Sequence, residues 1–233
     1  MPSIDLVIFD CDGVLVDSER ATSDAIAFSL TRFGHDIDGA GVLARYLGRT
    51  LPQIEADARA RGYELPEGWC GICETEMFDR LSREATVETD TLRLISSLGR
   101  RDVQVGIASN GANAKMKLTL GPSGIWHRFR SMILSGQDTG YPKPSPVMLQ
   151  TLMERVGVRP QNTVMIDDSE LGRRAADAAG CHFIGYRQFD PGGDTFDDCA
   201  FVARSMADVE TILEEIGGAC LQPPTDVESA FSI

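Results

Sequence analysis

Lysine is scarce in this sequence of 233 residues. Only Lys115, Lys117 and Lys143 occur, and arginine supplies the rest of the 22 basic residues. The basic residues are outnumbered by 35 acidic ones, which gives a formal net charge of −13. Because a nucleic-acid backbone is itself strongly negative, this balance argues against nucleic acid as a partner.

Long apolar segments are also missing. No run approaches the roughly 18 residues that a transmembrane helix needs, so no membrane partner is expected. Met1-Pro2-Ser3 leads directly into a predicted strand, and no signal peptide is recognisable. We therefore expect a cytoplasmic protein, either a monomer or a dimer. Its length suits one large domain, or one domain with a small additional module.

The chain has six cysteines, which are too few for a disulfide-rich scaffold and are expected to stay reduced in that compartment. The stretch Trp69-Cys70-Gly71-Ile72-Cys73 is similar to a redox motif. It has the pattern of a first helical turn, however, and the strand that should precede such a motif is missing. A functional thiol pair and simple helix packing are both open for Cys70 and Cys73, and packing is favoured.

Most of the sequence alternates between strand and helix patterns. Short apolar runs rich in β-branched residues predict buried strands, and helical patterns separate them in the second part of the chain. This alternation predicts an α/β protein with a parallel sheet and right-handed crossovers. The predicted strands are residues 4–9, 103–108, 132–134, 163–166 and 181–185.

One long segment departs from this alternation. Residues 18–85 show only helical patterns, so we expect an all-helical module inserted after the first strand. This module either caps the crevice at the strand ends or packs on the sheet, and the first alternative is favoured. The expected division is a core of residues 1–17 and 86–217, a cap of residues 18–85, and a tail of residues 218–233 without clear periodicity.

Polar residues follow the predicted strands where each one ends. Asp10 and Asp12 follow the first strand, Ser109 ends the second, and Asp167-Asp168 ends the fourth, while the loop after the third leads to Lys143. Parallel strands bring their carboxyl ends to one rim, so we expect these side chains together. Each alone has a simpler interpretation, as a helix cap or a solvated loop residue. Together they suit a phosphate group held by Mg²⁺.

The run from Asp10 to Glu19, Asp-Cys-Asp-Gly-Val-Leu-Val-Asp-Ser-Glu, resembles the first motif of the haloacid dehalogenase (HAD) superfamily. The later Ser109, Lys143 and Asp167-Asp168 also match that superfamily in order. The resemblance extends over nearly the whole chain except the tail. It implies a Rossmann-like core with a small helical cap, and Mg²⁺-dependent hydrolysis of a small phosphate monoester.

The resemblance also implies roles for individual residues. Asp10 resembles the nucleophile that forms an aspartyl phosphate. Asp12 resembles the general acid and base, and its backbone carbonyl would ligate Mg²⁺. Asp168 would ligate Mg²⁺ directly, whereas Asp167 stands where relatives often have Glu and would be a direct or an indirect ligand. The remaining expected site residues are Ser109, Asn110 and Gly111 at the phosphoryl oxygens, Lys143 at the phosphate and Asp10, and Arg49 at the distal part of the substrate.

The subclass has more than one candidate. Asp12 argues against dehalogenase chemistry, which lacks an acid there. A β-phosphoglucomutase-like phosphotransferase is an alternative, although that family has a histidine where this chain has Thr22 and a cap lysine that residues 18–85 lack. The later motifs are similar to bacterial sugar-phosphate phosphatases of the 6-phosphogluconate type. A sugar or sugar-acid phosphate is therefore expected, and a non-catalytic phosphometabolite-binding protein is a less favoured alternative.

The prolines around Lys143 predict a local backbone feature. Proline occupies every second position in Tyr141-Pro142-Lys143-Pro144-Ser145-Pro146, which restricts the backbone on both sides of Lys143. The lysine must point toward Asp10 while its chain feeds the next helix. We expect a cis peptide bond between Lys143 and Pro144, because such a bond reverses the chain locally.

Overall fold

The computed structural model describes residues 3–46, 49–188, 196 and 199–217 of the chain. These residues divide into two compact units. One comprises the described residues of Met1–Val16 and Val87–Ile233, and the other comprises those of Asp17–Thr86. The expected tail of residues 218–233 and an expected loop at residues 190–194 lie outside the described residues.

A parallel sheet forms the centre of the first unit. Its order is β3-β2-β1-β4-β5-β6 within the described residues, and every neighbouring pair is parallel. From β1 the chain builds outward to β3, then returns to place β4 on the other side of β1. Ligands bind at such a switch point in open α/β sheets. The predicted Rossmann-like parallel sheet is confirmed. The strands are β1 (Leu6–Phe9), β2 (Gln104–Ser109), β3 (Ile133–Ser135), β4 (Thr163–Asp167), β5 (His182–Tyr186) and β6 (Val202–Ala203).

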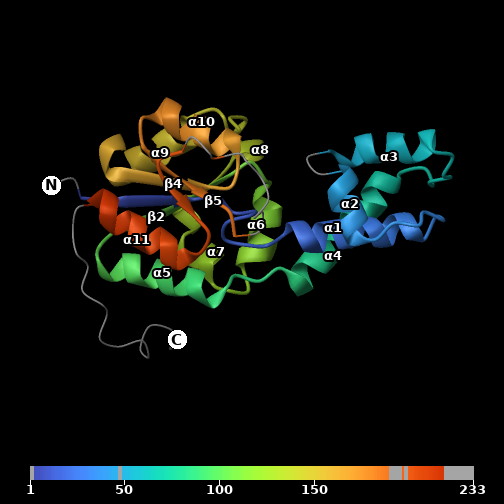
Figure 1. Ribbon diagram of the computed structural model, residues 1–233, viewed down its shortest axis with the longest axis horizontal. Helices are drawn as coiled ribbons and strands as arrows, with labels where there is room; N and C mark the ends of the chain where they lie inside the picture. The colour runs from blue at the N-terminus through green and yellow to red at the C-terminus, as the bar shows by residue number, and fades with distance from the viewer. Residues whose placement is uncertain (1–2, 47–48, 189–195, 197–198, 218–233) are drawn as a thin grey trace. The chain divides into compact units, whose positions relative to one another are not determined.

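Helices cover both faces of this sheet (Figure 1). Helices α9 (Val147–Val156) and α10 (Glu170–Ala179) lie on one face, and α5 (Thr89–Arg100) and α11 (Met206–Gly217) lie on the other. Alternate residues of the strands, such as Leu6 and Ile8, point toward α9 and α10 and are fully buried there. Shorter helical segments follow β2 and β3: α6 (Asn113–Leu120), α7 (Ile125–Arg128), α8 (Gly136–Thr139), and the 3₁₀ turns Arg130–Met132 and Pro160–Asn162.

The second unit is built from helices. In its described residues these are α1 (Glu19–Thr31), α2 (Gly39–Tyr46), α3 (Leu51–Ala60) and α4 (Trp69–Glu84). They surround an apolar cluster of their own, which includes Leu30, Tyr46 and Trp69. None of the described helices, in either unit, has the length and apolar character needed to cross a bilayer.

The thiols of α4 fit the packing interpretation. Cys73 is buried in the apolar cluster, and the Cys70 thiol donates a hydrogen bond to Glu55 over 3.0 Å. Burial raises the pKa of Cys73 to about 12, and burial together with Glu55 raises the pKa of Cys70 to about 11. Because the thiolate is the reactive form, these protonated thiols are poor nucleophiles.

The observed elements differ from the predicted ones mainly at their ends. β1 begins at Leu6 rather than at Ile4, and β3 ends at Ser135, one residue later than predicted. Strand β6 was not predicted, because its two residues are too few for any apolar alternation to be seen. Boundary shifts of one or two residues are ordinary, since element ends depend on local capping.

Leu152 offers a test of the core. This fully buried residue of α9 packs against β2 at Gly106, where an added Cβ would lie 3.1 Å from the Leu152 side chain. We expect Leu152→Ala to lower the free energy of unfolding by about 2–5 kcal/mol, because it removes buried methyl groups and leaves a cavity. Urea unfolding measures this loss.

Leu171→Ala is the matched control, since Leu171 is 43% exposed. We expect it to change the free energy of unfolding by less than about 0.5 kcal/mol. A loss below about 1 kcal/mol for Leu152→Ala would contradict the described packing.

Candidate active site

The carboxyl ends of three neighbouring strands meet at the middle of the sheet. Asp10 follows β1 directly, and its backbone N–H donates to the carbonyl of Ile166 in β4 over 2.9 Å. β1 lies between β2 and β4, so Ser109 and Asp167, at the ends of those strands, flank Asp10. All three residues are buried. The structure therefore brings these predicted site residues together at the rim.

Lys143 connects the carboxylates of this rim. Its ammonium donates to Asp10 Oδ1 over 2.8 Å and to Asp167 Oδ2 over 2.5 Å. The Lys143 side chain is only 3% exposed, so its charge has little access to water. A buried charge is tolerated only when it is paired and hydrogen-bonded, and two carboxylates provide that pairing.

Asp10 and Lys143 shift each other's pKa. Burial raises the pKa of Asp10 to about 7, with Lys143 opposing that rise and Asp167 adding to it. Burial alone would lower the pKa of Lys143, but the neighbouring Asp10 and Asp167 hold that pKa above its usual range. The ammonium is therefore charged at neutral pH and favours the ionised form of Asp10.

The side chain of Asn110 fixes the backbone of Lys143. Asn110 Oδ1 accepts the Lys143 N–H over 2.6 Å, and Asn110 Nδ2 donates to the Lys143 carbonyl over 3.1 Å. These two bonds join the loop after β2 to the loop after β3. The sequence predicted only that Asn110 binds a phosphoryl oxygen. The binding of the Lys143 backbone by the Asn110 side chain was missed.

The peptide bond between Lys143 and Pro144 is cis, which confirms the expectation from the proline spacing. The turn is closed by the Ser145 N–H, which donates to the Pro142 carbonyl over 2.9 Å. Helix α9 then begins at Val147.

Three carboxylates lie close enough to share a cation. Asp10, Asp167 and Asp168 each offer an oxygen, and these oxygens lie within 4.8 Å of one another. With all three ionised, their three negative charges exceed the single charge of Lys143 by two. Hard oxygen ligands with this charge balance fit Mg²⁺. The residues present are therefore compatible with the expected metal.

Gly13 makes room for one of these carboxylates. A Cβ at this position would lie 1.9 Å from Asp168 Oδ2, and the residue has a φ of +79°. Both facts require glycine, because a side chain would clash and would strain the backbone. The glycine in the first motif thus lets Asp168 approach the loop that carries Asp12.

Asp167 is held by the start of helix α10. Its Oδ1 accepts from the Ser169 N–H over 2.9 Å and from Ser169 Oγ over 2.6 Å. Ser169 Oγ also accepts from the Gly172 N–H over 3.1 Å, so Ser169 caps the helix. A Cβ at Gly172 would lie 2.0 Å from Asp167 Cγ. Ser169 and Gly172 were missed as site residues. The signal for them was a serine three positions before a glycine at the predicted start of the helix.

Asp12, Ser109 and Gly111 form a second group beside the first. Ser109 Oγ accepts the Gly111 N–H over 3.1 Å. A Cβ at Gly111 would lie 3.4 Å from both Asp12 Oδ2 and Ser109 Oγ. The Asp12 carboxylate pairs with the Lys115 ammonium over 2.8 Å. Lys115 was not among the predicted site residues, although the scarcity of lysine was a signal.

Arg49 is the one expected site residue that belongs to the second unit. Its guanidinium lies over the ring of Tyr46, 5.9 Å from the ring centroid. Its expected contact with substrate stays a prediction.

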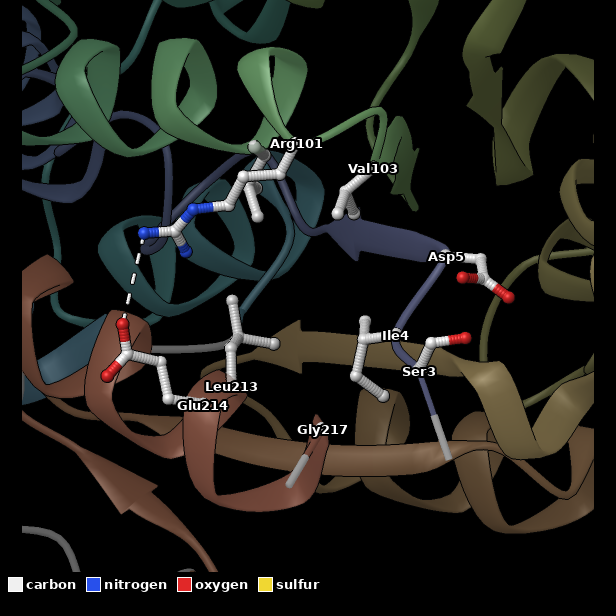
Figure 2. A pocket seen from close by; sticks show the side chains of 9 residues that line it. Ser3, Ile4, Asp5, Arg101, Val103, Leu213, Glu214 and Gly217 are labelled. Atoms are coloured by element: carbon white, nitrogen blue, oxygen red, sulfur yellow. Dashed lines mark ion pairs between the residues drawn. The ribbon is translucent and has the colours of Figure 1, made fainter. Parts of the chain in front are cut away.

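A cavity of about 220 Å³ lies at the other end of the sheet (Figure 2). Asp5 and Val103, which line it, immediately precede β1 and β2, so they are at the amino ends of these strands. Leu213 of α11 borders it, and Arg101 and Glu214 form an ion pair of 3.8 Å at its edge. The cavity is therefore separate from the rim that carries Asp10.

The chain belongs to the haloacid dehalogenase-like hydrolases, because a model of that family matches residues 4–180. This match confirms the family prediction. The chain is 29% identical over 182 residues to the 6-phosphogluconate phosphatase of Escherichia coli (strain K12), a match that covers 77% of this chain and 81% of the relative. It is 27% identical over 192 residues to a phosphoglycolate phosphatase of Yersinia pseudotuberculosis, covering 77% and 79% of the two chains.

Solved structures of the same family have a fold similar to that of this chain over most of its length. A HAD family hydrolase from Deinococcus radiodurans R1, solved with bound phosphate and sodium, has a TM-score of 0.79 and 25% sequence identity to this chain. The comparison covers 93% of this chain and 98% of that chain. The family membership thus rests on fold as well as sequence.

Asn110 allows a test of how the site is held. Asn110→Ala removes two hydrogen bonds to Lys143 and leaves a backbone N–H of that residue without its acceptor. We expect the free energy of unfolding to fall by about 1–3 kcal/mol, the cost of an unpaired buried polar group. Urea unfolding measures this change.

Asn113→Ala is the control, because Asn113 is exposed and uses its backbone N–H, not its side chain, to bind Asp138. It should alter the free energy of unfolding by less than about 0.5 kcal/mol. Equal losses for the two variants would refute the assigned function of the Asn110 side chain.

Proposed function

We propose that this protein is a Mg²⁺-dependent phosphatase that hydrolyses a small phosphate monoester through an aspartyl-phosphate intermediate. The observation that carries the proposal is the position of Asp10. Asp10 directly follows β1, and its carboxylate accepts a hydrogen bond from the Lys143 ammonium. It also belongs to the acidic group with Asp167 and Asp168. Nucleophile, neutralising cation and metal-binding oxygens thus meet at one point, in a chain of the HAD-like hydrolase family.

The reaction proceeds in two displacements. In the first, a carboxylate oxygen of Asp10 forms a bond to phosphorus, and the bond from phosphorus to the ester oxygen breaks. Asp12 donates its proton to the departing alkoxide, which leaves as an alcohol. In the second, Asp12 takes a proton from water, the water oxygen forms a bond to phosphorus, and the bond from phosphorus to the Asp10 oxygen breaks. This releases inorganic phosphate and restores Asp10.

The chain's own cations and donors stabilise charge during these steps. Lys143 favours the ionised form of Asp10, orients its carboxylate and would face the negative phosphoryl group. Ser109 Oγ, with the neighbouring amides of Asn110 and Gly111, is the proposed partner of the phosphoryl oxygens. The Gly111 N–H donates to Ser109 Oγ over 3.1 Å, so a hydrogen bond within the loop holds these proposed partners next to each other.

Mg²⁺ would be held by Asp10, Asp168 and the backbone carbonyl of Asp12. When bound, it supplies positive charge that offsets the charge of the phosphate oxygens. Asp167 supports the site indirectly in this proposal, because its two oxygens already bind Ser169 and Lys143. Asp168 is thus the proposed metal ligand, and the adjacent Asp167 is the proposed positioning group.

The proposed substrate is a sugar or sugar-acid phosphate. The name of one relative, a 6-phosphogluconate phosphatase, supports this choice, and another relative is a phosphatase of the smaller hydroxy-acid ester phosphoglycolate. The expectations that residues 18–85 cap the site, that Arg49 contacts substrate and that the protein is cytoplasmic remain predictions.

A phosphotransferase of the β-phosphoglucomutase type is the second candidate. The same nucleophile and acid would serve it, so the rim does not separate the two functions. The sequence favours hydrolysis, because Thr22 replaces that family's histidine and residues 18–85 contain no lysine. A requirement for a bisphosphate without release of free phosphate would favour the transferase. A pure binding protein would have no need for both Asp10 and Asp12.

Asp10→Asn tests the proposed nucleophile. It replaces the attacking carboxylate with an amide of nearly the same shape, so we expect Mg²⁺-dependent phosphate release to fall by about a thousandfold or more. Phosphate release is measured on a panel of sugar and organic-acid phosphates, with circular dichroism to confirm folding.

Asp102→Asn is the matched control. Asp102 is exposed, and asparagine tolerates its φ of +58°. The control should keep wild-type activity. Activity of folded Asp10→Asn within about tenfold of wild type would rule out the nucleophile assignment.

Asp168→Asn tests the proposed metal site. The change removes one carboxylate charge from the acidic group, so we expect the Mg²⁺ concentration for half-maximal activity to rise by about tenfold or more. A chelator should abolish wild-type activity, and added Mg²⁺ should restore it. An unchanged Mg²⁺ dependence in the variant would exclude Asp168 as a ligand.

A further inference from the structure

Lys115 is the second lysine at the rim, and its neighbour is the proposed acid. Its ammonium lies 2.8 Å from Asp12 Oδ1, and the two side chains are 25% and 27% exposed. Lys143, in contrast, is almost fully buried between Asp10 and Asp167. The first pair is therefore open to solvent and to a ligand, whereas the second is enclosed.

This ion pair has little value for stability. Partly exposed ion pairs contribute little to folding, because water and salt screen them. Lys115 also lies in the first turn of α6, where the helix dipole disfavours a cation. No gain in stability explains a lysine here, so a contribution to the chemistry of the site is the better explanation.

Hydrogen bonds fix the loop before Lys115, and a glycine leaves space beside the Lys115 side chain. The Asn113 N–H donates to Asp138 Oδ2 over 2.7 Å, and Ser135 Oγ donates to the Gly111 carbonyl over 2.7 Å. These bonds fix the loop that leads into α6. A Cβ at Gly111 would touch the Lys115 stem at 4.0 Å and the Asp12 carboxylate at 3.4 Å, so glycine keeps this space open.

We infer that Lys115 is a specificity-determining residue that binds a negatively charged group on the alcohol part of the substrate. This inference rests on the proposed function, because Asp12 must lie next to the leaving oxygen in order to protonate it. A cation paired with Asp12 is then next to the first atoms of the alcohol. A carboxylate on that alcohol can replace Asp12 as the partner of Lys115, since one carboxylate is exchanged for another.

A substrate carboxylate competes with Asp12 for the Lys115 ammonium, so an alcohol that carries a carboxylate gains an ion pair on binding. A neutral alcohol leaves the Asp12 ion pair in place. The substrate class is therefore phosphate esters of hydroxy acids, in preference to esters of neutral alcohols.

Matched substrate pairs test this inference. One pair is 2-phosphoglycolate and 2-hydroxyethyl phosphate, and another is 6-phosphogluconate and glucitol 6-phosphate; the members of each differ in one carboxylate. In the wild type, kcat/KM should favour the carboxylate member. Lys115→Met should lower kcat/KM for that member by about 10- to 100-fold, the range for a hydrogen bond to a charged group, and change the neutral member by less than about threefold.

Two further variants separate charge recognition from a structural function. Lys115→Arg keeps the cation and should retain most of the preference. Lys117→Met removes an exposed lysine of the same helix and should leave both members unaffected. Equal losses for both members in Lys115→Met would show that Lys115 only positions Asp12, and would overturn the inference.

Binding measurements keep the inference independent of turnover. In the Asp10→Asn background with Mg²⁺, calorimetry should show tighter binding of the carboxylate member, and Lys115→Met should remove that difference. If neither carboxylate probe binds more tightly than its neutral partner, the inference is wrong. Absence of phosphate release from every ester in the wild type would instead contradict the proposed function, and the binding comparison would still decide the assignment of Lys115.

Discussion

The buried ammonium of Lys143 is the interaction on which the rest of the rim depends. A charge this deeply enclosed requires partners at hydrogen-bonding distance, and Asp10 and Asp167 supply them at 2.8 and 2.5 Å. These partners come from the ends of β1 and β4, and the lysine itself comes from the loop after β3. The arrangement therefore holds only if the strands that carry these groups end side by side, which the parallel order around β1 ensures.

The carboxylates can crowd around this ammonium because two backbone positions lack side chains. Gly13 admits Asp168 beside the loop that carries Asp12, and Gly172 admits Asp167 against the start of α10. Crowded carboxylates repel one another, so the group is stable only with added positive charge. Lys143 provides part of that charge, and the excess of two negative charges is what a divalent cation would balance. The burial of the lysine and the fit of the acidic group to a divalent cation thus have the same physical origin.

The sequence predicted the meeting of Asp10, Ser109, Lys143 and the Asp167-Asp168 pair because strand ends in a parallel sheet obey a simple rule. It did not predict the two bonds from the Asn110 side chain to Lys143, or the contact of Gly172 with Asp167. The first contact joins two loops 33 positions apart in the chain, and the second depends on the conformation of the turn before α10. No periodic pattern in the sequence records such contacts. Strand β6 was not predicted for a different reason, because two residues are too few to show an alternation of apolar and polar residues.

The two lysines of the rim differ in one physical property, their access to solvent, and this difference divides their proposed functions. Lys143 is enclosed, so its partners are fixed before any ligand arrives, which suits a group that must orient the nucleophile without reorganisation. Lys115 is partly exposed, so its pairing with Asp12 is exchangeable at little cost. A phosphate ester has a constant part, the phosphoryl group, and a variable part, the alcohol. A fixed cation fits the constant part, and an exchangeable cation fits the part that distinguishes one substrate from another.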